Sequence, residues 1–468
     1  MKDLGMLKSA CIVVLFSVAA TIAAPAQTFN TLVNFNDANG GDPINTTLVQ
    51  GTDGNFYGTS VGGTNNEGAL FNLSSAGALT TLHNFNTTDG SLPEGVALVQ
   101  GTDGNFYGTT ARGGANGEGT VFKITPSGTL TTLHSFNGAD GEGPIGGVVL
   151  ARDGNFYGTT TGGGATSAGT IFRITASGTL TTLHTFRNKD GRFPESGLTL
   201  GADGNLYGTT VFGGLYQNIN CVNTLGELAY CGAIFKITPG GTFTLLHSFN
   251  GLDGFEPFQL TLGADGNLYG MTNGGGLNGV GTVFKITATG SFTSLYSFDF
   301  RNSIGDLPYG GLVQATDGNF YGTTGGPIFG TIFEMTPAGV PTLLHTFEDT
   351  DGCYPGGSLL QATDGSFYGT TTFCGTSGNG TVYNLGVGLS PFALTRPTSG
   401  RVGTKVTILG NNLTGTTAVS FNGTAASFKV LSDSEIATMV PAGATQGTVT
   451  VSTPGGTLNS NVVFVVTK

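Results

Sequence analysis

The chain has 468 residues, of which 82 are glycine, 33 are phenylalanine and none is tryptophan, and its formal net charge is −12. Only 10% of the residues are charged and they are scattered, which excludes a long disordered tail of like charges. Many tight turns combined with phenylalanine-rich packing predict an all-β protein.

The N-terminus has the pattern of a secretory signal peptide, predicted over residues 1–26. Lys2 and Lys8 come before an apolar stretch over residues 10–24, and small residues at 24–26 form a cleavage site. The apolar stretch is too short to cross a bilayer comfortably. We therefore expect an exported protein that is secreted, periplasmic or at the bacterial cell surface, with no transmembrane segment in its mature form.

A tandem repeat occupies most of the remaining chain. The segment TDGNFYGTT at residues 102–110 has relatives at six other places, and the intervals between their aspartates run from 47 to 62 residues, which is typical of a propeller. Each unit contains four short strand candidates, called A to D. In the third unit they cover residues 146–151, 155–160, 169–175 and 179–186. The repeated aspartates are Asp53, Asp103, Asp153, Asp203, Asp265, Asp317 and Asp364.

The repeated motif is interpreted as a turn between strands A and B. Asp-Gly between two strand-forming runs indicates a tight hairpin, because glycine accepts a positive φ, and Asp103 can accept hydrogen bonds from nearby amides. A calcium or catalytic motif is the alternative. Each copy offers one carboxylate where a hard cation needs six or more oxygens, so we expect a scaffold role.

The two ends of the repeat predict how it closes. The seventh unit stops at TVYNLG, residues 381–386, without a D strand, whereas TFNTLVNF at residues 28–35 has the D pattern. Pairing these two segments would remove two exposed sheet edges. The sequence therefore predicts a seven-bladed β-propeller over residues 27–388, closed by its N-terminal strand, with the A strands nearest the axis. An open solenoid is the alternative, and it leaves the N-terminal strand unexplained.

The cysteines that remain after the signal peptide predict two disulfides. Because strand direction alternates, the D-to-A and B-to-C connections share one face of the propeller, here called the loop face. The longest B-to-C connection contains Cys221 and Cys231, while Cys353 and Cys374 lie in D-to-A and B-to-C connections that meet at this face. An even number of cysteines in an oxidising compartment favours one bridge within each pair. A four-sulfur zinc site lacks paired C-x-x-C spacing.

Two segments resemble known families. The motifs DGNFYGTT, GTVFKIT and LTTLHSF, repeated over residues 28–385, resemble the Gloeo/Verruco (GloVer) tandem-repeat family of exported bacterial proteins, a resemblance that implies no established chemistry. The segment RPTSGRVGTKVTILGNNLTG and its continuation, within residues 391–468, look like an IPT/TIG immunoglobulin-like domain. That resemblance implies a small β-sandwich that serves exported bacterial proteins as an accessory or interaction module.

The pattern of titratable residues does not predict a metal or cofactor. All five histidines occupy one D-strand position, so we expect them far apart around the rim. Acids in the D-to-A connections could act as general acid and base on a sugar or gather a cation, but the favoured interpretation is that they belong to turns. The histidines are His83, His134, His184, His247 and His345. The acids are Asp89, Glu94, Asp140, Glu142, Asp190, Glu195, Asp253, Glu256 and Asp351.

We expect an exported binding or surface-interaction protein, monomeric and without enzymatic activity, whose loop face recognises polysaccharide or a cell-surface protein. The acidic repeat region disfavours nucleic acid as a partner. The alternatives are a glycan-active hydrolase or lyase that uses loop-face carboxylates, and a structural cell-envelope protein. The candidate ligand-binding residues are Tyr216, Tyr230, Tyr354, Asp190 and Glu195.

Overall fold

The computed structural model describes residues 27–36, 39–95, 97–222, 228–326 and 328–467, so the predicted signal peptide lies outside the described residues. Around Cys221 only the backbone is described at residues 217–220, 222 and 228–230. Every regular element in these ranges is a β-strand, which confirms the all-β prediction. No helix that is long and apolar enough for a membrane crossing occurs in the part of the chain described here.

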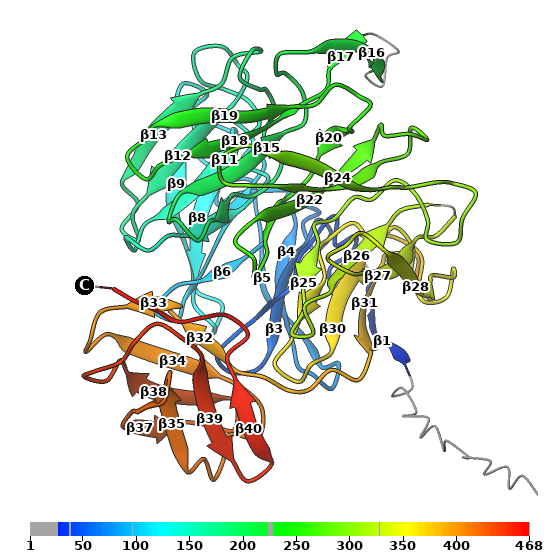
Figure 1. Cartoon of the computed structure of the whole chain (residues 1–468). Helices are drawn as coiled ribbons and strands as arrows, with labels where there is room; N and C mark the ends of the chain where they lie inside the picture. The colour runs from blue at the N-terminus through cyan, green and yellow to red at the C-terminus, as the bar shows by residue number, and fades with distance from the viewer. Residues whose placement is uncertain (1–26, 37–38, 96, 223–227, 327, 468) are drawn as a thin grey trace, which may run out of the picture.

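The repeat region folds into consecutive antiparallel sheets, and all but the last are built from strands in chain order (Figure 1). The first two sheets contain β2 Val49–Gln50, β3 Phe56–Ser60, β4 Ala69–Leu73 and β5 Leu79–Asn84, then β6 Val99–Gln100, β7 Phe106–Thr110, β8 Thr120–Ile124 and β9 Leu130–Ser135. The next two contain β10 Val148–Leu150, β11 Phe156–Thr160, β12 Thr170–Ile174 and β13 Leu180–Thr185, then β14 Thr199–Leu200, β15 Leu206–Thr210, β18 Ala233–Ile237 and β19 Phe243–Ser248. The A strands are the shortest.

Two further sheets and a small ribbon continue the series. The fifth sheet contains β20 Phe255–Pro257, β21 Thr261–Leu262, β22 Leu268–Gly274, β23 Thr282–Ile286 and β24 Phe292–Ser297. The sixth contains β25 Val313–Gln314, β26 Phe320–Thr324, β27 Thr331–Met335 and β28 Pro341–Thr346. The ribbon of β16 Gln217–Val222 and β17 Leu228–Tyr230 belongs to the long B-to-C connection.

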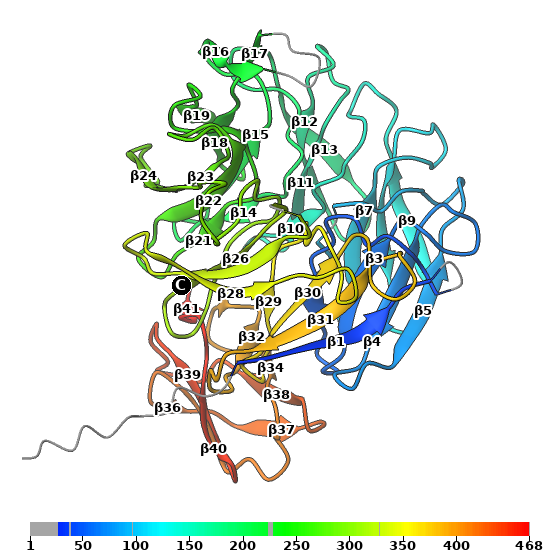
Figure 2. The ribbon, with the colours of Figure 1, turned by 90° about the vertical axis from the view of Figure 1, so that its right-hand side faces the viewer.

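The last sheet of the repeat region joins the two ends of that region. It contains β29 Leu360–Gln361, β30 Phe367–Thr371 and β31 Thr381–Gly386, and its fourth strand is the N-terminal β1 Thr28–Asn34. β1 runs antiparallel to β31, with Thr28 opposite Gly386 and Asn34 opposite Thr381. Figure 2 shows β1 in blue beside the yellow β31. The pairing expected from the D-like pattern of residues 28–35 is therefore present.

The core lies between neighbouring sheets. Phe106, Phe122 and Ile124, predicted as core, are fully buried and pack with residues of the preceding sheet. The ring of Tyr57 from that sheet stacks on Phe106 with centroids 4.0 Å apart. Since B and C strands bury both faces, each sheet depends on its neighbours for stability.

The repeated Asp-Gly motif forms the predicted turn. Gly104 has a φ of 81°, and Asp103 accepts hydrogen bonds from the Asn105 amide at 3.2 Å and from the Tyr107 hydroxyl at 2.9 Å. Burial raises the pKa of Asp103, but hydrogen bonds from the Asn105 side chain, the Tyr107 hydroxyl and the Asn105 backbone, together with the nearby Lys123 charge, outweigh burial and hold the pKa below its usual value. The carboxylate is thus used to hold its own hairpin.

Both predicted disulfides are present. Cys221 is bonded to Cys231 and Cys353 to Cys374, with Cα separations of 5.2 and 5.4 Å. The first links β16 to the residue that follows β17, and the second joins the D-to-A and B-to-C connections of the last sheet.

The C-terminal domain is a small β-sandwich. One sheet contains β32 Leu394–Arg396, β34 Lys405–Leu409, β38 Glu435–Met439 and β37 Phe428–Val430, and the other contains β36 Thr424–Ala425, β35 Ala418–Phe421, β39 Val449–Thr453 and β40 Gly456–Asn459. β33 Ser399–Gly400 pairs with β41 Val465–Val466. The domain packs against the face of the repeat region that contains the A-to-B turns, here called the turn face (Figure 1). At this contact, the Ser434 hydroxyl donates to the Thr52 carbonyl at 3.2 Å.

Candidate functional site

A proline precedes the A strand of every sheet in the repeat region. The residue before this proline has a positive φ, between 49° and 63°, in all seven connections. Such a backbone is uncommon for side chains such as Leu92 and Phe193 and persists only where the surroundings hold it. The prolines are Pro43, Pro93, Pro144, Pro194, Pro257, Pro308 and Pro355.

Backbone hydrogen bonds hold these strained positions. The Leu92 amide donates to the Glu67 carbonyl at 2.8 Å, and the Leu92 carbonyl accepts from the Ala111 amide at 2.9 Å. Phe193 is held in the same way by Ala168 and Val211, at 3.1 Å each. The residue that follows each proline is therefore fixed by the scaffold, whatever its side chain.

The residues after the prolines converge on one cavity at the loop face. Its volume is about 280 Å³, and all seven connections contribute to its wall, so we call it the central cavity. The connections approach one another closely: a Cβ on Gly146 would lie 2.6 Å from the Ser196 carbonyl carbon. The seven post-proline residues are Ile44, Glu94, Ile145, Glu195, Phe258, Tyr309 and Gly356.

The wall of the central cavity has an acidic part and an aromatic part. Glu94 and Glu195 supply carboxylates, while Phe258 and Tyr309 supply rings whose centroids are 6.0 Å apart. Tyr309 is 38% exposed, so its ring is accessible from the cavity. Gln259 adds a side-chain amide to the wall. This combination can hydrogen bond to hydroxyl groups and contact an apolar surface at once.

The two carboxylates of the cavity wall, and the nearby Glu256, have raised pKa values. The Glu195 side chain is exposed to solvent in the cavity, but protein surrounds it on the other sides. This burial raises the pKa of Glu195 to about 7, and the nearby Glu256 and Glu94 carboxylates contribute a smaller part of the increase. Burial also raises the pKa of Glu94, against a smaller lowering by Arg112, and burial raises that of Glu256. Near neutral pH, Glu195 can therefore donate or accept a proton.

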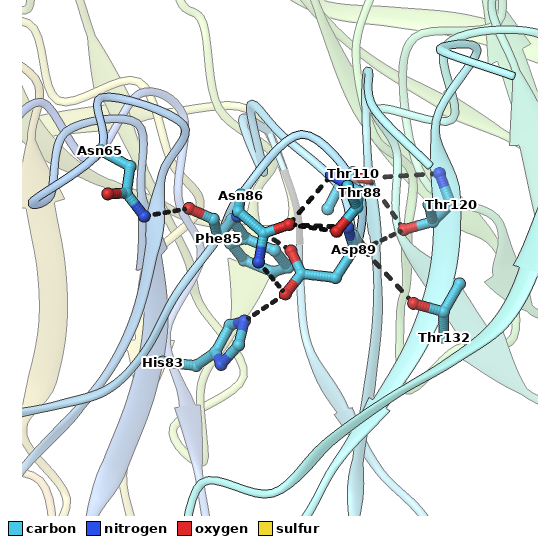
Figure 3. A network of polar contacts seen from close by, with 9 residues as sticks. All are labelled: Asn65, His83, Phe85, Asn86, Thr88, Asp89, Thr110, Thr120 and Thr132. Atoms are coloured by element: carbon cyan, nitrogen blue, oxygen red, sulfur yellow. Dashed lines mark hydrogen bonds and ion pairs between the residues drawn. The ribbon is translucent and has the colours of Figure 1, made fainter. Parts of the chain in front are cut away.

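Histidines on the D strands pair with aspartates of the D-to-A connections, and Figure 3 shows the first of these pairs. His83 Nε2 lies 3.0 Å from Asp89 Oδ2, and Asp89 also accepts from the Asn86 amide at 2.9 Å. Five repeats share this pair, at separations between 2.9 and 3.3 Å. These five aspartates therefore hold turns, which supports the turn interpretation over the proposal that they act as acids near the axis. A histidine stands six residues before each of these aspartates, and this spacing is the sequence signal that could have predicted the pairs.

The comparisons with known proteins agree with the repeat pattern. Residues 15–222 and 218–429 match the model of the Gloeobacter/Verrucomicrobia repeat. The chain belongs to this family. Residues 393–466 of this Gloeobacter/Verrucomicrobia repeat protein match the IPT/TIG domain, so both predicted resemblances are confirmed. None of the curated proteins matches the chain.

Solved structures resemble this repeat protein in fold. A fungal alcohol oxidase of the AA5 family, solved in complex with copper, is 14% identical with a TM-score of 0.50, and the match covers 94% of this chain and 99% of the oxidase. The extracellular domain of a putative one-component system from B. thetaiotaomicron is 12% identical with a TM-score of 0.47, covering 94% and 58%. At these identities the first likeness shows the fold alone. Within the described residues, no cluster of three or more His, Cys, Asp or Glu side chains is arranged to hold a metal ion.

The structure separates the predicted ligand-binding residues of this repeat protein. Glu195 lines the central cavity, whereas Asp190 lies in a rim turn with its Oδ2 3.3 Å from His184 Nε2. Tyr216 is 52% exposed in the long loop, and the side chain of Tyr230 lies outside the described residues. Tyr354, 45% exposed, is the positive-φ residue before a proline.

Sequence reasoning missed the two aromatic residues of the cavity, Phe258 and Tyr309. The available signal was a constant proline followed by a residue that varies among the repeats.

Proposed function

We propose that this protein is an exported carbohydrate-binding protein, in which the seven sheets form a closed seven-bladed propeller and the central cavity holds a sugar unit. The convergence of all seven post-proline residues on one cavity carries this proposal. A constant backbone with a variable residue at each proline is suited to presenting a specific wall to a ligand. The two disulfides fit an oxidising compartment outside the cytoplasm.

Contacts across the seam support the closed ring. The Thr363 amide in the last sheet donates to Gln50 Oε1 in the first at 3.0 Å, and the Thr370 hydroxyl donates to the Thr46 carbonyl at 2.9 Å. Phe56 and Phe71 of the first sheet pack in one cluster with Val382 of the last. The same kind of glutamine contact joins the first two sheets, where Gln100 accepts from the Thr52 amide at 3.1 Å.

The chemistry of the cavity wall fits a sugar. Sugar hydroxyls donate hydrogen bonds to carboxylates and amides, while the C–H face of the ring packs on aromatic side chains. Glu94, Glu195 and Gln259 supply the first kind of contact, and Phe258 and Tyr309 supply the second. The volume of about 280 Å³ suits a single sugar unit at the end of a chain or branch.

A second candidate function is glycan hydrolysis or elimination. The raised pKa of Glu195, about 7, favours this second function. Glu195 lies near the Glu256 and Glu94 carboxylates, and a proton-donating carboxyl near an ionised one can act with it as general acid and base. Glu195→Gln separates the two functions. If the protein is an enzyme, the wild type releases reducing ends or unsaturated products, and Glu195→Gln removes this turnover while the sugar still binds. If it is a binding protein, the wild type releases no such products.

The proposal is tested by titrating the purified protein with a panel of neutral oligosaccharides in a calorimeter. We expect saturable binding of at least one sugar, weakened at least about fivefold in Tyr309→Ala, the equivalent of roughly 1 kcal/mol of aromatic contact. Tyr216→Ala is the matched control because Tyr216 lies in the long loop outside the cavity wall. Loss of binding in the control alone would move the site to the long loop. Absence of saturable binding would favour a structural envelope protein.

A further inference from the structure

A second cavity lies between the propeller and the C-terminal domain, at the turn face. Its volume is about 450 Å³. The propeller contributes the ends of three innermost strands and A-to-B turn residues that include Arg152, and the C-terminal domain contributes residues 395–401, Thr404 and Thr467. We call it the interdomain cavity. It shares no lining residue with the central cavity.

The charge of the interdomain cavity is opposite to that of the whole protein. The net charge of the chain is −12, yet this wall contains Arg152, Arg396 and Arg401 and not one aspartate or glutamate. None of these three arginines forms an ion pair with a carboxylate among the described residues; the ion pairs found there are all between histidine and aspartate. The cavity therefore concentrates uncompensated positive charge.

Arg396 is the most deeply placed of the three. Its Nη2 donates to the Gln50 carbonyl at 2.7 Å and its Nη1 donates to Gln100 Oε1, so both partners are neutral. Burial lowers the pKa of Arg396 to about 10, the direction expected when a cation is taken out of water without an anion beside it. A bound anion would remove this imbalance.

The other two arginines of the wall are accessible to solvent, and one buried hydroxyl of the wall lacks a partner in the part of the chain that the structure describes. Arg401 is exposed, and Arg152, also exposed, donates from Nη2 to the Ala202 carbonyl at 3.0 Å. The buried hydroxyl of Thr395, which also lines the cavity, has no hydrogen-bond partner within the described residues. Buried hydroxyls normally find a partner.

We propose that the interdomain cavity is a second binding site, which takes an oxyanion group of an acidic ligand: a sulfate, a phosphate or a sugar carboxylate. Guanidinium groups match the geometry of such oxyanions and form charge-assisted hydrogen bonds with them. The site needs both domains, because Arg152 comes from the propeller and Arg396 and Arg401 from the C-terminal domain. Occupancy therefore favours the docked arrangement of the two domains.

Calorimetric titration of the full-length protein with sodium sulfate, sodium phosphate and digalacturonate, in low-salt chloride buffer, tests this proposal. We expect saturable binding of at least one probe, and the probe bound most tightly distinguishes the three sources of the oxyanion. The double variant R152Q/R401Q should bind that probe about tenfold to a hundredfold more weakly. Lys429→Gln is the matched control, because it removes a positive charge of the same domain that is exposed and outside the wall.

Arg401→Lys keeps the charge but loses the fork of donors, so it should bind with intermediate affinity. A thermal unfolding transition unchanged from the wild type verifies that each variant folds. Absence of saturable binding of all three probes would overturn the proposal, and so would equal weakening in R152Q/R401Q and Lys429→Gln. Tyr309→Ala should leave oxyanion binding unchanged, so the two cavities are tested separately.

Discussion

Phe35 provides the sharpest test of whether the N-terminal strand closes the ring. Phe35 follows β1, is fully buried and packs edge-on against Phe71 with ring centroids 5.3 Å apart. Its amide donates to the Gly380 carbonyl, 345 residues later in the chain, at 3.0 Å. Replacing a fully buried phenylalanine by alanine costs about 3 to 5 kcal/mol in lost burial and cavity formation. Phe35→Ala should therefore lower the free energy of unfolding by that amount.

The chain supplies an internal control for this prediction. Phe136 occupies the same position in the middle of the repeat region, is equally buried, and packs on Phe172 with centroids 5.2 Å apart. Its amide donates to the Gly119 carbonyl at 3.0 Å. Urea unfolding followed by circular dichroism should give similar losses for Phe35→Ala and Phe136→Ala. A loss below about 1 kcal/mol in Phe35→Ala alone would show that the N-terminal segment is not part of the core, and would refute the closed ring.

Three further predictions concern stability. Replacing Cys353 and Cys374 by alanine should lower the free energy of unfolding by about 3 kcal/mol, because the bridge closes a loop of 21 residues, and thermal melts with and without reductant check this. Gly104→Ala should cost about 1 kcal/mol through its φ of 81° alone, because an added Cβ meets no atom within 4 Å; a loss near zero in urea unfolding would contradict this. Because the folded state holds the Glu195 proton up to a pH of about 7, whereas the unfolded chain releases it near pH 4.5, stability should fall as pH rises between these values. Glu195→Gln should remove that part of the pH dependence, and melting temperatures of both proteins across the window measure it.

The scaffold was predictable because its signals are local and repeated. Asp103 and Gly104 specify their turn within four residues, and alternation along the strands specifies the buried faces. The disulfide between Cys353 and Cys374 followed from strand direction, which brings both connections to the same face, and from the even number of cysteines.

The binding site was less predictable because its residues lie in different repeats. Phe258 and Tyr309 are about 50 residues apart in the sequence, and neither belongs to a motif. Their proximity depends on the curvature of the whole set of sheets, which no local pattern encodes. Asp190 and Glu195 looked equivalent as acids of one connection. The Arg187 amide, however, donates to Asp190 Oδ1 at 2.6 Å and holds it in a rim turn, while the proline directs Glu195 to the cavity wall.

A crystal structure of the protein with its best-bound neutral oligosaccharide would show whether the central cavity is the sugar-binding site. We expect one sugar unit in the central cavity, with its hydroxyl groups within hydrogen-bond distance of Glu94 or Glu195 and its C–H face against Tyr309. Sugar density on the long loop around Tyr216, with the central cavity containing only water, would contradict it.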